Sequence, residues 1–84
     1  METDEKRISN NIKSQIYRYG FSMGSLANKM GISRQALSRI INNPYRTNIK
    51  KLNVIADNIG CNIDDFFVAV EFTKSEGQEL WNYI

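Results

Sequence analysis

Residues 23–42 read MGSLANKMGISRQALSRIIN, a pattern that predicts two short helices joined by a tight turn. Ala27 provides a small side chain at the centre of the first helix, where two crossing helices must approach closely. Gly31 falls in a turn too tight for a side chain, Ile32 fills the corner from inside, and Leu37 anchors the second helix. This spacing is typical of two helices that cross at roughly 90–120° through a turn of about three or four residues.

Capping residues place further helices before and after this pair. An apolar stripe at Ile8, Ile12 and Ile16 predicts an amphipathic helix that ends at Gly20. N-cap residues mark the expected starts of four more helices, namely Ser22, Ser33, Asn48 and Asn62. Hydrophobic pairs at staple spacing support three of these starts: Phe21 with Leu26, Ile32 with Leu37, and Cys61 with Phe66. The sequence therefore predicts an all-α bundle of five helices over residues 6–67.

Residues 68–84 form a C-terminal extension with a different pattern. Val68, Val70 and Phe72 alternate with other residues at a period of two, which suits a short strand. Residues 74–77, KSEG, fit either a turn or the start of a helix, and residues 80–84 are mostly apolar. We therefore expect a short strand, a further helix, or both in this extension.

The charges are distributed unevenly along the chain, although the net charge is only +2. Residues 6–51 contain ten Lys or Arg and no Asp or Glu. Residues 52–84 contain six acidic residues and one basic residue, and residues 1–5 contain three acidic residues. A cationic half joined to an anionic half predicts a polyanionic partner for the cationic half.

Several classes of function are disfavoured by the composition. The chain has no His and one Cys, which argues against a protein-built metal site and against His-based catalysis. No glycine-rich phosphate loop is present, so we expect no enzyme activity and no cofactor. No apolar run approaches the roughly 18–20 residues that span a bilayer. The N-terminal METDEKRISNN lacks the apolar centre of a signal peptide, and we expect a cytoplasmic protein with no membrane partner.

With these helices around it, the segment 23–42 resembles the helix-turn-helix domain of the phage repressor/Cro (XRE-like) family of transcriptional regulators. The resemblance covers about residues 8–67. It includes the string NIKKLNVIADNIGCNIDDFF at residues 48–67, where Leu52, Ile55, Ala56, Gly60 and Ile63 match the pattern of the family. The resemblance implies a repressor-like five-helix fold, with a DNA-binding domain over residues 6–67.

Helix 33–42 is the expected recognition helix. Leu37, Ile40 and Ile41 point inward, so the opposite stripe is exposed. The expected base-reading residues on this stripe are Arg34, Gln35, Ser38 and Arg39. An arginine fork fits guanine O6 and N7, glutamine fits the adenine edge, and a serine permits close approach. In the family that the chain resembles, the positions of Arg34, Gln35 and Arg39 are the usual base readers.

Phosphate contacts are expected from residues that flank this helix. The candidates are Ser22, Ser25, Ser33, Asn42, Asn43, Tyr45, Arg46, Asn48 and Lys50. Many members of the family place a phosphate-binding glutamine where this chain has Met23. Asn48 can serve as a helix cap as well as a ligand, and Tyr45 can either touch a phosphate or pack over Pro44.

These features predict a sequence-specific repressor, of phage or mobile-element type, that binds a palindromic operator in double-stranded DNA as a homodimer. A DNA-binding domain of this size contacts few base pairs, so useful specificity needs two half-sites. Candidate dimer or partner contacts in the extension are Val68, Val70, Phe72, Leu80 and Trp81. Two alternatives remain: an antitoxin whose tail binds a toxin, and a protein-interaction module that has lost DNA binding.

Overall fold

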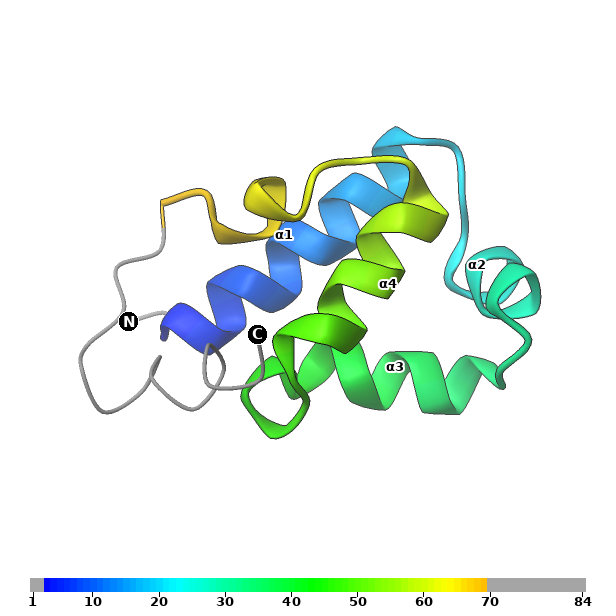
Figure 1. Cartoon of the computed structure of the whole chain (residues 1–84), viewed down its shortest axis with the longest axis horizontal. Coiled ribbons are helices and arrows are strands. Elements are labelled where there is room, and N and C mark those ends of the chain that lie inside the picture. The colour runs from blue at the N-terminus through cyan, green and yellow to red at the C-terminus, as the bar shows by residue number, and fades with distance from the viewer. Residues whose placement is uncertain (1–2, 70–84) are drawn as a thin grey trace.

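Four α-helices and two short 3-10 helices make up the part of the chain that the computed structural model describes, residues 3–69 (Figure 1). The α-helices are α1 (Asp4–Arg18), α2 (Met23–Met30), α3 (Arg34–Asn42) and α4 (Ile49–Ile59). The 3-10 helices are η1 (Pro44–Arg46), which joins α3 to α4, and η2 (Ile63–Phe67), which follows α4. The predicted all-α architecture is therefore confirmed for these residues, and α2 and α3 form the helix pair around Gly31.

The helix starts are fixed by the caps that the sequence indicated. Ser22, Ser33 and Asn48 each accept a hydrogen bond from a backbone N–H in the first turn of α2, α3 and α4, respectively. The sequence indicated no cap for the first helix; in the structure Thr3 caps α1, which begins at Asp4, a full turn before the apolar stripe. The acidic side chains of Asp4 and Glu5 then lie at the helix N-terminus, where the helix dipole favours them.

The predicted fifth α-helix is instead the 3-10 helix η2, so the expectation of five α-helices is not confirmed. Asn62 caps this segment as predicted, but its side chain accepts from the N–H of Asp64, only two residues on. The N–H of Asp65 donates to the Asn62 carbonyl, which closes a tight i to i+3 turn. Five residues in this tight geometry are enough to carry Phe66 into the core.

The strand predicted from Val68 onward does not begin where expected. Val68 and Ala69 form a turn, and Ala69 has a φ of 61°, in the left-handed region. Asn11 on α1 donates its side-chain amide to the carbonyls of Phe66 and Val68, and Arg7 donates to the carbonyl of Ala69. These bonds tie the segment to α1 rather than to a strand. The rest of the predicted strand and the apolar C-terminus lie outside the described residues.

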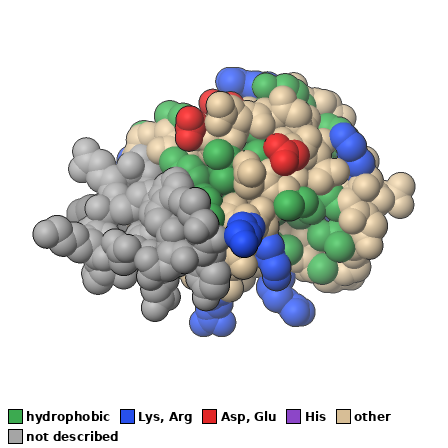
Figure 2. All heavy atoms as spheres, viewed as in Figure 1, with side chains coloured by type: hydrophobic (Ala, Val, Ile, Leu, Met, Phe, Trp, Pro, Cys, Tyr) green, Lys and Arg blue, Asp and Glu red, His purple; other side chains and the backbone are tan. Residues whose placement is uncertain are grey.

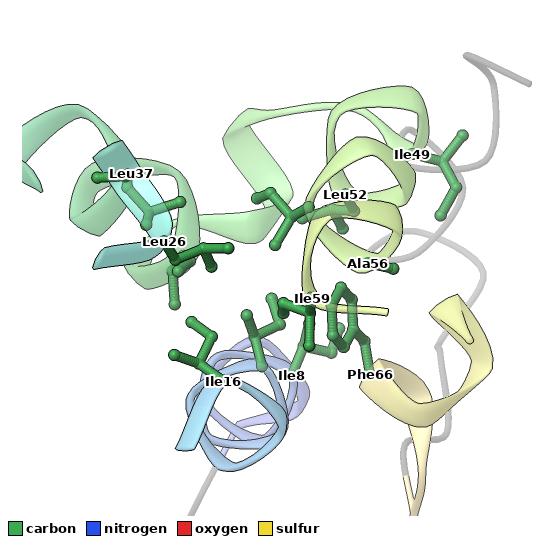
Figure 3. Close-up of a cluster of buried hydrophobic side chains, with 13 residues drawn as sticks. Ile8, Ile16, Leu26, Leu37, Ile49, Leu52, Ala56, Ile59 and Phe66 are labelled. Atoms are coloured by element: carbon green, nitrogen blue, oxygen red, sulfur yellow. The ribbon is translucent and has the colours of Figure 1, made fainter. Parts of the chain in front are cut away.

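Thirteen buried hydrophobic residues from all four α-helices and η2 form one core (Figure 3). Phe66 points into this cluster from η2 and is fully buried, as are Leu26 on α2 and Leu37 on α3. Leu26 and Leu37 hold the helix pair against α1 and α4, so the angle between α2 and α3 is set by packing. The remaining members are Ile8, Ile12, Ile16, Ala27, Ile41, Ile49, Leu52, Ile55, Ala56 and Ile59.

Lys29 joins α2 to α4 through a polar contact at the edge of this core. Its Nζ donates to the carbonyl of Asn58 at 2.6 Å and lies 5.2 Å from the centre of the Phe21 ring. A cation near the C-terminal end of α4 is favoured by the helix dipole, and a cation over an aromatic face is attracted by the ring. Lys29 therefore stabilises the position of the helix pair.

Gly31 and Gly24 provide a matched test of the turn between α2 and α3. Gly31 caps α2 with a φ of 73°, and a Cβ placed there would meet no atom within 4 Å. Gly31→Ala should therefore destabilise the domain by about 1 kcal/mol through backbone strain alone. Gly24 lies inside α2 without positive φ, so Gly24→Ala should stabilise it by about 0.5 kcal/mol. Urea unfolding measures both changes, and equal signs would contradict the turn geometry.

Candidate nucleic-acid interface

The outer face of α3 carries the four side chains that the sequence predicts to read bases. Arg34, Gln35 and Arg39 are exposed, and Ser38 is half-buried on the same face. On the opposite face Leu37 is completely buried in the core. Figure 1 shows α3 along the lower edge of the molecule, where its outer face looks away from the other helices. The structure thus brings the predicted base readers together on one accessible surface.

The three longest side chains on this face are held by no hydrogen bond or ion pair within residues 3–69. Arg34, Gln35 and Arg39 make no side-chain hydrogen bond or ion pair in that part of the chain. A guanidinium that has no intramolecular partner keeps its full fork of N–H donors for a ligand. The face can therefore bind groups that accept hydrogen bonds in pairs, such as guanine edges or phosphates.

The N-terminus of α2 presents a second set of donors. Ser22 and Ser25 form a capping box: Ser22 Oγ accepts from the Ser25 N–H at 3.0 Å, and Ser25 Oγ accepts from the Ser22 N–H at 2.8 Å. Ser25 Oγ also donates to the Ser22 carbonyl, so its proton is used within the box. The Ser22 hydroxyl proton and the first N–H groups, on Met23 and Gly24, remain for an external anion.

An open groove of about 230 Å³ lies between α3, η1 and the start of α4. Its lining combines three cationic side chains with polar and apolar ones: Arg39, Ile40, Asn43, Arg46, Thr47 and Lys51. The Oγ1 atom of Thr47 is buried and has no hydrogen-bond partner among the described residues. A buried hydroxyl without a partner is unfavourable, and the polar surface that the groove offers to a ligand comes mainly from its three cationic side chains.

Figure 2 shows several basic side chains along the lower edge of the visible face, where Figure 1 places α3 and the start of α4, and others at the top and the right of the same view. The acidic side chains visible in the same view lie higher on the molecule. Arg46, Lys50 and Lys51 are all exposed. Part of the cationic surface of the molecule therefore lies beside the outer face of α3.

Three of the predicted phosphate ligands have structural roles around the loop after α3. Asn43 donates its side-chain amide to the carbonyl of Arg39 at 3.0 Å, which caps the end of α3. Asn48 accepts from the Lys51 N–H at 2.9 Å and caps α4. Tyr45 packs against the core with its hydroxyl buried, which favours the packing role over a phosphate contact. These bonds hold the loop that carries Arg46.

The sequence patterns did not indicate two residues of this region, Thr47 and Glu5. Thr47 and Lys51 line the groove, and Glu5 on α1 accepts the backbone N–H of Tyr45 at 3.1 Å. The Glu5 contact joins residues 40 positions apart, so no local pattern could indicate it. Lys51 follows Lys50 at the start of α4, next to the loop that is expected to contact the DNA backbone.

Cys61 lies away from this surface, between α4 and η2. Burial, and to a smaller extent the nearby Asp65 carboxylate, raise the pKa of the Cys61 thiol. The thiol is therefore largely protonated at neutral pH and behaves as a small apolar group. Its half-buried position against the core agrees with the staple predicted from its spacing to Phe66.

The predicted dimer contacts are largely beyond what the structure describes. Val68 is exposed, with 59% of its surface accessible, and follows directly after η2. The other four candidates, Val70, Phe72, Leu80 and Trp81, lie outside residues 3–69. The role of the extension therefore stays a prediction.

A family model of the Cro/C1-type helix-turn-helix DNA-binding domain matches residues 11–71. The match covers well over half of the chain and includes α2, the turn at Gly31 and α3. The chain belongs to the Cro/C1-type family. The resemblance inferred from the helix pair and from residues 48–67 is thereby confirmed. No curated protein and no solved structure matches the chain.

Membership of the Cro/C1-type family supports a DNA-binding regulator, and domains of this family are typically not enzymes. In helix-turn-helix domains the second helix of the pair is the one that usually enters the major groove, and α3 is the second helix of the pair in this chain. Among residues 3–69, no helix has both the length and the apolar character needed to cross a membrane.

Proposed function

We propose that the protein is a sequence-specific DNA-binding regulator that acts as a repressor by occupying an operator with α3 in the major groove. One observation carries this proposal. Within residues 3–69, Arg34, Gln35 and Arg39 have no side-chain hydrogen bond or ion pair, and they share one exposed face of a helix whose other face is anchored in the core. A structural role would not require three long polar side chains without partners on the same face.

Each side chain has a role that follows from its donors and acceptors. Arg34 and Arg39 each offer a two-pronged donor to guanine O6 and N7. Gln35 pairs with the N6 and N7 edge of adenine, because its amide both donates and accepts. Arg34 and Gln35 stand in the first turn of α3, the part of a recognition helix that enters the groove most deeply.

Phosphates on the two sides of the major groove meet the donors that flank α3. One phosphate lies at the N-terminus of α2, where the first N–H groups and the Ser22 hydroxyl point outward. Another lies in the groove beside Arg39, which Arg46 and Lys51 also line. Such contacts fix the register of the protein on the duplex and contribute affinity for any sequence.

Replacing Lys50 or Lys51 by alanine should weaken binding to every duplex by the same factor. Each lysine that neutralises a phosphate releases counterions, so the slope of log K against log salt should flatten by about 0.9. Affinities for operator and random duplexes over a series of salt concentrations measure this slope. Lys13→Ala, on α1, is the control and should leave the slope unchanged. A loss confined to the operator would contradict the assignment to phosphates.

We further propose that the protein binds as a homodimer through residues 68–84. The exposed Val68 leads into this apolar extension, and the hydrogen bonds from Asn11 and Arg7 hold its base against α1. A chain that ends at Ala69 should be a monomer by light scattering and should bind a single half-site. A truncated chain that remains a dimer would exclude the extension as the dimer contact.

Selection of bound duplexes from random DNA tests the proposed function. We expect one motif, repeated as two-fold related half-sites about one helical turn apart. An unrelated set of recovered sequences would contradict sequence-specific recognition.

A further inference from the structure

A chain of three polar side chains runs from α1 to the outer face of α3. Ser9, on α1, is only 5% exposed, and its Oγ donates to Oδ1 of Asn42 at 3.4 Å. The side-chain Nδ2 of Asn42 in turn donates to Oγ of Ser38 at 3.1 Å. Asn42 is the last residue of α3, one turn beyond Ser38. A nearly buried group on a neighbouring helix thus orients a side chain on the base-reading face.

The direction of these bonds determines what Ser38 can offer to a ligand. An amide oxygen only accepts and an amide nitrogen only donates, whereas a serine hydroxyl can do either. Because Ser9 donates to Oδ1, the amide of Asn42 turns its Nδ2 toward Ser38. The Ser38 oxygen then accepts from Asn42, and its proton remains as the group directed to an external partner. Among residues 3–69, Ser38 Oγ donates to no other atom.

We propose that Asn42 is a positioning residue that makes Ser38 a hydrogen-bond donor toward the DNA. The inference rests on the proposed function, in which the outer face of α3 lies in the major groove. A donor there favours base edges that accept, such as guanine N7 and O6 or thymine O4, and disfavours the N4 amino donor of cytosine. Ser38 and Asn42 together thus add a preference against cytosine at one position of the operator.

The test compares three variants on the selected operator and on duplexes changed at one position at a time. Ser38→Ala identifies the contacted position, because the preference is lost there by about fivefold, the typical effect of one neutral hydrogen bond. Asn42→Ala should lose the same preference at the same position, because the free hydroxyl can then both donate and accept. Preferences at positions read by Arg34 and Gln35 should not change in either variant.

Asn42→Asp provides the sharper comparison. Its carboxylate only accepts, so Ser38 must donate to it and present its lone pairs to the DNA. The preference at the contacted position should then reverse toward cytosine. For each variant, the affinities for two duplexes are compared as a ratio. The general repulsion between the added charge and DNA lowers both affinities equally, so it cancels in this ratio. Thermal melts confirm that each variant is folded, and a merely structural role of Asn42 would lower stability without reversing a base preference.

Two results overturn this inference while the proposed function stands. The first is an Asn42→Ala protein that keeps the preference that Ser38→Ala loses. The second is a Ser38→Ala protein whose base preferences all equal those of the original chain. A chain without base preference at any position would overturn the proposed function, and this inference with it.

Discussion

Arg34→Ala should lower affinity for the selected operator by about 1–3 kcal/mol and leave affinity for random DNA almost unchanged. Arg34 is exposed at the first position of α3, and its side chain makes no hydrogen bond or ion pair within residues 3–69. Its removal therefore takes away base contacts without disturbing the fold, and alanine is favourable in a helix. Fluorescence anisotropy at one fixed salt concentration, with operator and random duplexes, measures the effect.

Arg18→Ala is the matched control, because it removes the same charge from an exposed site on α1. It should change affinity for the two duplexes equally and slightly. Arg39→Ala should act as Arg34→Ala does, at a different base pair. An equal loss on operator and random DNA in Arg34→Ala would show that this arginine contributes only charge, and the assignment as a base reader would then be wrong.

Phe66→Ala should lower the free energy of unfolding by about 3–5 kcal/mol, the usual effect of removing a buried aromatic ring. Phe66 is completely buried and is among the largest side chains in the core. It joins η2 to the core formed with α1 and α4 (Figure 3). Because a small domain has only about 5–15 kcal/mol of stability, a large drop in the melting temperature is expected by circular dichroism.

Tyr17→Ala is the control for this loss, since Tyr17 is also aromatic but 63% exposed. Its effect should stay within about 0.5 kcal/mol. If Phe66→Ala also changed stability by less than about 1 kcal/mol, η2 would not be part of the cooperative domain. The core packing shown in Figure 3 would then be wrong for Phe66, its largest side chain.

Local sequence signals predicted most of the fold because caps and stripes act over a few residues. Ser22, Ser33 and Asn48 each bind an N–H only three positions ahead, so their side chains mark helix starts directly. The structure of the segment after Asn62 could not be predicted from such local signals. Its continuation depends on bonds from Asn11, more than 50 positions away in the sequence, and no local pattern contains that information.

Some features of the candidate site could likewise be predicted from the sequence, and others could not. The exposed face of α3 follows from the helical period alone, so Arg34, Gln35 and Arg39 could be placed from the sequence. The groove beside Arg39 requires the path of the loop through η1, which is fixed partly by the bond between Glu5 and the Tyr45 N–H. The contact of Asn42 with Ser9 likewise joins distant helices, so only the structure reveals it.

Sequence-specific recognition by α3 is tested most directly by a ratio of two affinities. One is the affinity for the selected operator, and the other is the affinity for a scrambled duplex of equal length and composition. Both affinities should be measured at the same near-physiological salt concentration, because phosphate contacts alone vary strongly with salt. If α3 reads the operator sequence, we expect a ratio of roughly 10³ or more. A ratio close to one would show that the cationic surface binds DNA without reading it, and would contradict the role assigned to the outer face of α3.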